Sequence, residues 1–180
     1  ASLTAVLHRT AGAQDNSSSI SPRWSLVRRW GGGAHVAETG GVRLDVAFTS
    51  PSPEFEDMAQ ASRKQPGREY ARFFGKKLTP MDLARCRYQL APEGNDVATS
   101  LGWQLYTNSV VLMPPPTKEN WLLQGELRPW EHYVPVRRDW EDLGVRLRWC
   151  EANRAAGANI SANARAHVLR LFSAGAESER

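Results

Sequence analysis

The sequence lacks several features that would identify a function directly. Only two cysteines occur among its 180 residues, and neither has a cysteine or histidine nearby at the spacing of zinc ligands, so no zinc site is expected. We expect Cys86 and Cys150 to be buried as small apolar side chains. No apolar run approaches the ~18 residues of a membrane-spanning helix, so no transmembrane segment is expected.

The chain also lacks a concentration of charge of one sign. Its 23 basic and 19 acidic side chains are interleaved and leave a formal net charge of +4. The basic residues gather only in doublets such as Arg28–Arg29, Lys76–Lys77 and Arg137–Arg138. A nucleic-acid-binding face usually clusters Lys and Arg between aromatic side chains, so we expect no nucleic-acid partner.

The composition is that of a folded globular domain. Hydrophobic residues make up 41% of the chain and seven residues are tryptophan. A chain of 180 residues is long enough for one domain with a substantial core. Because the sequence begins at Ala1 without methionine, we expect it to be a fragment of a longer protein.

Strand and helix patterns alternate along the chain, which predicts an α/β fold with a parallel sheet. The apolar run at 109–113 predicts a strand covered on both faces, and Pro135 predicts an edge position or a strand end. Capping residues before a proline predict helix starts at Ser21 and Thr79, and Asp139 is expected to cap a helix. The predicted strands are 3–7, 42–46, 87–91, 109–113 and 132–136, and the predicted helices begin near 21, 79, 97, 119 and 140. A last predicted helix places Ile160, Ala164 and Val168 on one face.

The passage "APEGNDVATSLGW", residues 91–103, has polar residues between a predicted strand and a predicted helix. Gly94 would let the backbone approach a ligand, and Asn95 or Asp96 would cap the helix. The N–H groups of residues 97–99 would then face outward at the positive end of the helix dipole, as in a phosphate site. A plain capping turn explains the same residues, and the spacing alone leaves both interpretations open.

Two longer stretches carry a family resemblance. "YQLAPEGNDVATSLGWQLYTNSVVLMPPPTKENW" and "LRPWEHYVPVRRDWEDL" resemble the C-terminal half of glycosyltransferase family 90, the capsule-associated and protein O-glucosyltransferase-like group. The resemblance is clear from Arg85 to Trp149 and weaker over residues 21–49. The chain departs from the family pattern near its start, where "VLHRTAG" only partly matches the motif expected for the family.

The resemblance implies a Rossmann-like parallel sheet flanked by helices, as the C-terminal donor-binding domain of a two-Rossmann-domain (B-type) glycosyltransferase. Residues 1–180 would then be one fragment of such an enzyme, without the N-terminal domain that supplies the acceptor site and the catalytic base. The catalytic residues are accordingly unknown. The implied donor-binding residues are Glu93, Gly94, Asn95, Asp96, Val97, Ala98 and Thr99, with Arg23 facing the diphosphate.

The implied reaction transfers glucose or xylose from a UDP-sugar to a hydroxyl of a protein or glycan acceptor, with inversion. The family is understood to need no metal or other cofactor, which agrees with the absence of a strict Asp-x-Asp motif. The alternative is a nonenzymatic module that retains nucleotide-sugar binding without transfer. The compartment is unknown: eukaryotic relatives work in the lumen of the endoplasmic reticulum or Golgi, and bacterial ones at the cytoplasmic face of the membrane.

A few other side chains remain candidates. His132 would either face a cleft or make structural hydrogen bonds, and we favour the structural role. Most of the tryptophans are expected in the core or at a domain interface, and only Trp121 or Trp130 is expected to contact a sugar or a base. Asp139 and Asp142 are expected to be helix caps.

Overall fold

A computed structural model describes residues 2–7, 22–31, 39, 41–48, 78–94 and 97–178. Within these ranges the chain forms a five-stranded sheet in the order β2-β1-β3-β4-β5, in which all four neighbouring pairs are parallel. The predicted α/β fold with a parallel sheet is therefore confirmed, with β5 at an edge as Pro135 indicated. The strands are β1 (Ser2–Leu7), β2 (Arg43–Phe48), β3 (Tyr88–Leu90), β4 (Val110–Met113) and β5 (Val134–Pro135).

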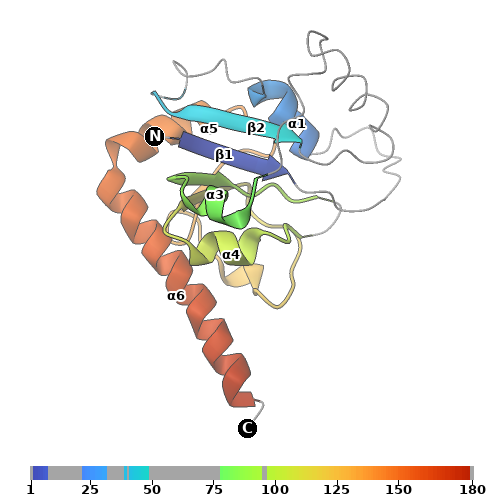
Figure 1. Cartoon of the computed structure of the whole chain (residues 1–180). Helices are drawn as coiled ribbons and strands as arrows, with labels where there is room; N and C mark the ends of the chain where they lie inside the picture. Colours follow the sequence, from blue (N-terminus) through green and yellow to red (C-terminus); the bar gives the residue numbers. More distant parts are fainter. Residues whose placement is uncertain are drawn as a thin grey trace.

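Helices cover both faces of this sheet (Figure 1). The last helix, α6, packs on α4 and β4 and then extends past the sheet, as Figure 1 shows. No helix in the described ranges combines the length and the apolar character needed to cross a membrane. The helices are α1 (Pro22–Trp30), α3 (Pro80–Ala84), α4 (Leu101–Tyr106), the 3₁₀ helix η3 (Gln124–Glu126), α5 (Leu143–Ala152) and α6 (Arg154–Ser178).

The two faces of the sheet hold two separate apolar clusters, as the alternation of side chains along a strand requires. Val110 and Leu112 of β4 face the cluster that includes α1 and α5. Val111 and Met113 face the cluster that includes α4 and α6. The whole strand is buried, which explains why its sequence is apolar without interruption.

The order of the strands reverses between β1 and β3. From β1 the chain passes through α1 to β2 on one side, whereas from β3 it passes through α4 to β4 on the other side. In doubly wound α/β folds, ligands bind outside the carboxyl ends of the strands at such a reversal. A ligand site is therefore expected at the segments that follow β1 and β3.

Three helix boundaries differ from the predictions. α4 begins at Leu101 after the N-cap Ser100, so the predicted start at 97 is wrong by four residues. The predicted short helix at 119–124 is instead the 3₁₀ turn Gln124–Glu126. The helix predicted from 140 begins at Leu143 because Trp140 has a φ of 62°, which a right-handed helix does not allow.

The left-handed conformation of Trp140 also changes the role of Asp139. Its Oδ1 accepts a hydrogen bond from the N–H of Glu141 at 3.1 Å, two residues on. The N-cap position belongs to Asp142, whose carboxylate accepts from the N–H of Arg137 and the side chain of Arg146 instead of from a helix N–H. The prediction that Asp139 caps the helix is therefore wrong, while Asp142 holds the cap position without a side-chain cap bond.

Candidate functional site

The loops after β3 and β4 are held together at the carboxyl end of the sheet by one carboxylate. Glu93, three residues after β3, accepts hydrogen bonds from the N–H and the hydroxyl of Thr117, at 2.8 and 2.6 Å. It also accepts from the N–H of Lys118 at 3.3 Å. The Glu93 side chain is only 15% exposed, whereas Thr117, its partner in this clamp, lies at the surface.

Two cations from neighbouring loops complete this corner. The ammonium of Lys118 donates to the carbonyl of Gly94 at 3.2 Å. Arg138, which follows β5, donates to the carbonyl of Pro115 at 3.3 Å and lies 3.9 Å from the Glu93 carboxylate. The segments after three adjacent parallel strands therefore meet here. Two positive charges beside one carboxylate leave this edge with a net positive charge, which favours binding of an anionic group.

The predicted donor-binding residues divide into three groups. Glu93 and Gly94 lie in the clamp. Val97 and Ala98 are buried, whereas Thr99 is exposed. Asn95 and Asp96 lie outside the described residues, as does the side chain of Arg23.

The helix start on which the dipole argument for residues 97–99 rests is wrong, while their part in donor binding stays a prediction. These residues precede α4, and the carbonyl of Ala98 accepts a hydrogen bond from the N–H of Leu101 at 2.9 Å. The helix has only six residues, Leu101–Tyr106, so its dipole is too small to define an anion site by itself. The cations Lys118 and Arg138 supply the positive charge at this edge instead.

In chain order, α1 follows β1, which is the neighbour of β3 in the sheet. β1 pairs with β3 in register, with Leu3 opposite Tyr88 and Thr4 opposite Gln89. The chain leaves the carboxyl end of β1 to enter α1, and Arg23 is the second residue of that helix. Arg23 and Glu93 thus belong to the segments on either side of the strand-order reversal.

Sequence reasoning missed Thr117, Lys118 and Arg138. The segment "PPPTKENW" has no predicted binding role of its own, and Arg138 enters the sequence analysis only as half of a basic doublet. A usable signal was present, because both segments directly follow predicted parallel strands. The carboxyl ends of such strands share one edge of the sheet.

His132 makes the structural hydrogen bond that the sequence favoured, and its side chain also lines an open hollow. Its Nδ1 accepts a hydrogen bond from the N–H of Arg128 at 2.9 Å, and its ring lies 5.5 Å from that of His167. Burial lowers the pKa of His132, and the neighbouring His167 adds to the effect while Glu131 opposes it. His167 is itself buried and lies 2.9 Å from the carbonyl of Leu122.

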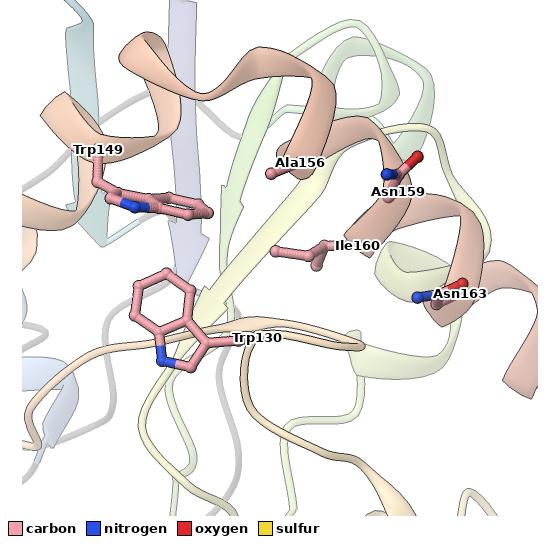
Figure 2. A pocket seen from close by; sticks show the side chains of 6 residues that line it. All are labelled: Trp130, Trp149, Ala156, Asn159, Ile160 and Asn163. Atoms are coloured by element: carbon pink, nitrogen blue, oxygen red, sulfur yellow. The ribbon is translucent and has the colours of Figure 1, made fainter.

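The two tryptophans singled out from the sequence are both exposed, to 57% for Trp121 and 41% for Trp130. Trp121 packs against Phe172 of α6, with ring centroids 5.5 Å apart. It also covers Gly102, where an added Cβ would lie 3.0 Å from the indole. Trp130 instead lines an open hollow beside α6 (Figure 2).

Together, the parallel sheet with helices on both faces and the loops converging at its carboxyl edge define a doubly wound α/β domain. Comparison with known proteins gives the family. The sequence profile described as "Glycosyl transferase family 90" matches residues 29–174, and the chain belongs to that family.

Three curated relatives illustrate the range of the similarity. O-glucosyltransferase LpsA of Dichelobacter nodosus is 44% identical over 78 residues, which cover 43% of this chain and 24% of that protein. Uncharacterized protein 027R of Frog virus 3 is 40% identical over 91 residues, covering 48% of this chain and 9% of that protein. Protein O-glucosyltransferase 3 of Rattus norvegicus is 33% identical over 73 residues, covering 40% and 14%. The similarity thus spans less than a quarter of each relative's length.

Proposed function

We propose that this chain supplies the nucleotide-sugar-binding half of a glycosyltransferase. The proposed reaction transfers glucose or xylose from a UDP-sugar to a hydroxyl of a protein or glycan, with inversion at the anomeric carbon and without a metal ion. The proposed architecture is the C-terminal domain of a two-domain, B-type enzyme. Membership of glycosyltransferase family 90 and the names of the O-glucosyltransferase relatives support this proposal.

The observation that carries the proposal is the clamp at the carboxyl edge of the sheet. Glu93 fixes the Thr117–Lys118 segment, so the ammonium of Lys118 is held beside the loop that follows β3. A preorganised cation of this kind stabilises charge as it develops on a leaving diphosphate. Arg138 and Arg23 are proposed to add to that positive charge, so that no metal ion is needed.

The remaining predicted residues receive roles within the same proposal. Gly94 lets the backbone approach the donor, and Asn95 and Asp96 bind hydroxyls of its ribose. Val97, Ala98 and Thr99 contribute backbone groups beside the diphosphate. The acceptor hydroxyl loses its proton to a carboxylate from a part of the enzyme outside this chain.

Calorimetric titration with UDP tests the donor site. The full chain should bind UDP saturably, and Lys118→Ala should weaken binding about tenfold, or about 1.4 kcal/mol. Lys118→Arg should restore most of the affinity because it returns the charge. Arg128→Ala is the matched control, since Arg128 is an exposed cation that precedes β5 instead of following a strand. Absence of UDP binding, or equal losses in both alanine variants, would contradict the proposal.

A second measurement separates transfer from binding alone. Release of UDP from UDP-glucose and UDP-xylose in the presence of an acceptor measures transfer by a protein that contains this chain. EDTA should leave UDP affinity and transfer unchanged if the cations replace a metal. UDP binding without any transfer would favour the nonenzymatic module.

A further inference from the structure

The hollow beside α6 has walls of an unusual composition. Its volume is about 430 Å³, within the range of small-molecule sites. Its lining combines apolar surface with two amide side chains and includes no ionisable group among the residues that the structure describes. The lining residues are Trp130, Trp149, Ala156, Asn159, Ile160 and Asn163.

The aromatic wall is held in a fixed arrangement. Trp130 and Trp149 pack edge to face, with ring centroids 4.6 Å apart and an angle of 66° between their planes. The guanidinium of Arg146 lies over the Trp130 ring at 5.2 Å, a cation–π contact. Trp130 also has a φ of 65°, a left-handed conformation that is costly for a bulky residue. Such conformations gather at binding sites because the surrounding structure must hold them in place.

The opposite wall is a polar stripe on α6. Asn159 and Asn163 are one helical turn apart and both are exposed, with no hydrogen-bond partner for their amides among the described residues. Each amide offers two donors and one carbonyl acceptor. Ile160 lies between the amides and the indoles, as Figure 2 shows.

We propose that this hollow binds a pyranose sugar. A pyranose has an apolar C–H face that packs on an indole ring and a rim of hydroxyls that both donate and accept hydrogen bonds. The Trp130 face and the two asparagine amides match these two features. The described lining residues are uncharged, and Arg146 beside Trp130 is paired with Asp142, so the hollow favours a neutral sugar over the nucleotide diphosphate of a donor.

The location also separates this hollow from the proposed donor site. Trp130 precedes β5, and Gly157 of α6 packs on Val110, the first residue of β4. The hollow therefore lies toward the amino end of the strands, whereas Glu93 and Lys118 follow the carboxyl ends. Sugar binding at the hollow does not depend on UDP binding, so either proposal can fail without the other.

Indole N–H resonances of the ¹⁵N-labelled full chain provide the test. The probes are methyl glucopyranosides and methyl xylopyranosides of both anomeric forms, with glycerol as a polyol that lacks a ring. Titration with at least one glycoside should move the Trp130 and Trp149 signals saturably, with a Kd of about 1 mM. The Trp121 signal should stay in place, and glycerol should move none. If no glycoside moves the Trp130 signal, or if all indole signals move equally, the proposal is wrong.

Matched variants locate the contacts. Trp130→Ala should abolish binding and Trp130→Phe should retain part of it, because Phe keeps an aromatic face. Asn159→Ala and Asn163→Ala should each weaken binding about tenfold, and alanine at exposed helix positions preserves the fold. Asn108→Ala is the control, since Asn108 is exposed and lies outside the hollow. Unchanged affinity in both asparagine variants would overturn the proposal.

Discussion

Removal of the Glu93 carboxylate should release the loop after β4 from the loop after β3. Glu93→Ala eliminates three hydrogen bonds, two with Thr117 and a longer one with the N–H of Lys118. Thr117→Val eliminates only the hydroxyl bond of 2.6 Å and leaves the backbone bond in place. The pair of substitutions therefore forms a double-mutant cycle around one contact.

The expected magnitudes follow from the contacts. A hydrogen bond to a charged group contributes about 1.5–3 kcal/mol, and we reduce this to about 1 kcal/mol because Thr117 is exposed. Glu93→Ala should then lower the free energy of unfolding by about 2 kcal/mol and Thr117→Val by about 1 kcal/mol. The double variant should lose about 2 kcal/mol, which leaves a coupling energy of about 1 kcal/mol.

Urea unfolding followed by tryptophan fluorescence measures these energies, and equal m-values in all four proteins would validate the comparison. UDP titration of Glu93→Ala should in addition show a loss of affinity, because Lys118 is no longer held in place. Additive losses, with a coupling energy below about 0.3 kcal/mol, would refute the idea that this contact joins the two loops. Wild-type UDP affinity in Glu93→Ala would refute its link to the donor site.

Two further predictions concern the partly buried Glu151 and the buried Cys150. Burial acts to raise the pKa of Glu151, but hydrogen bonds from Tyr88, Arg154 and a second arginine outweigh it and hold that pKa at about 2. The pKa of Glu151 in the folded protein lies below its ordinary value of 4.5. The ionised carboxylate therefore contributes its full stabilisation above pH 4.5, and this contribution is lost as the pH falls toward 2. Glu151→Gln should cost about 2 kcal/mol at neutral pH and show a shrinking difference from wild type during acid titration, whereas a pH-independent difference would contradict this. Burial raises the pKa of Cys150 to about 12, so in Cys86→Ser its thiol should react with a disulfide reagent at pH 8 only in urea; rapid labelling of the folded protein would disprove it.

Local sequence signals predicted several elements correctly. Thr79 and Asp82 form the reciprocal capping box expected at the start of α3, with hydrogen bonds of 3.0 and 3.2 Å. The proline after Ser21 is the first residue of α1. Ile160 and Val168 are buried on one face of α6 as their spacing required. Each of these signals acts within one or two helical turns, so neighbouring residues suffice to specify it.

Predictions failed where a tertiary contact overrode the local signal. Asp139 precedes a helical pattern as a cap would, but Trp140 is fully buried and its carbonyl accepts a hydrogen bond from the indole of Trp30 at 2.9 Å. Packing of two tryptophans 110 residues apart accompanies the left-handed turn at Trp140, and α5 starts only after it. No short window of sequence contains that information.

The sequence by itself determined the alternation of strands and helices, the apolar strand at 109–113 and the family to which the chain belongs. These depend on side-chain periodicity, on local caps and on residues in a specific order. Only the tertiary structure decided which loops meet at the carboxyl edge, and that Glu93 binds Thr117 across 24 residues. It also placed Trp130 beside α6. The physical reason is that strand order, and hence the neighbours of each loop, results from burying both faces of the sheet at once.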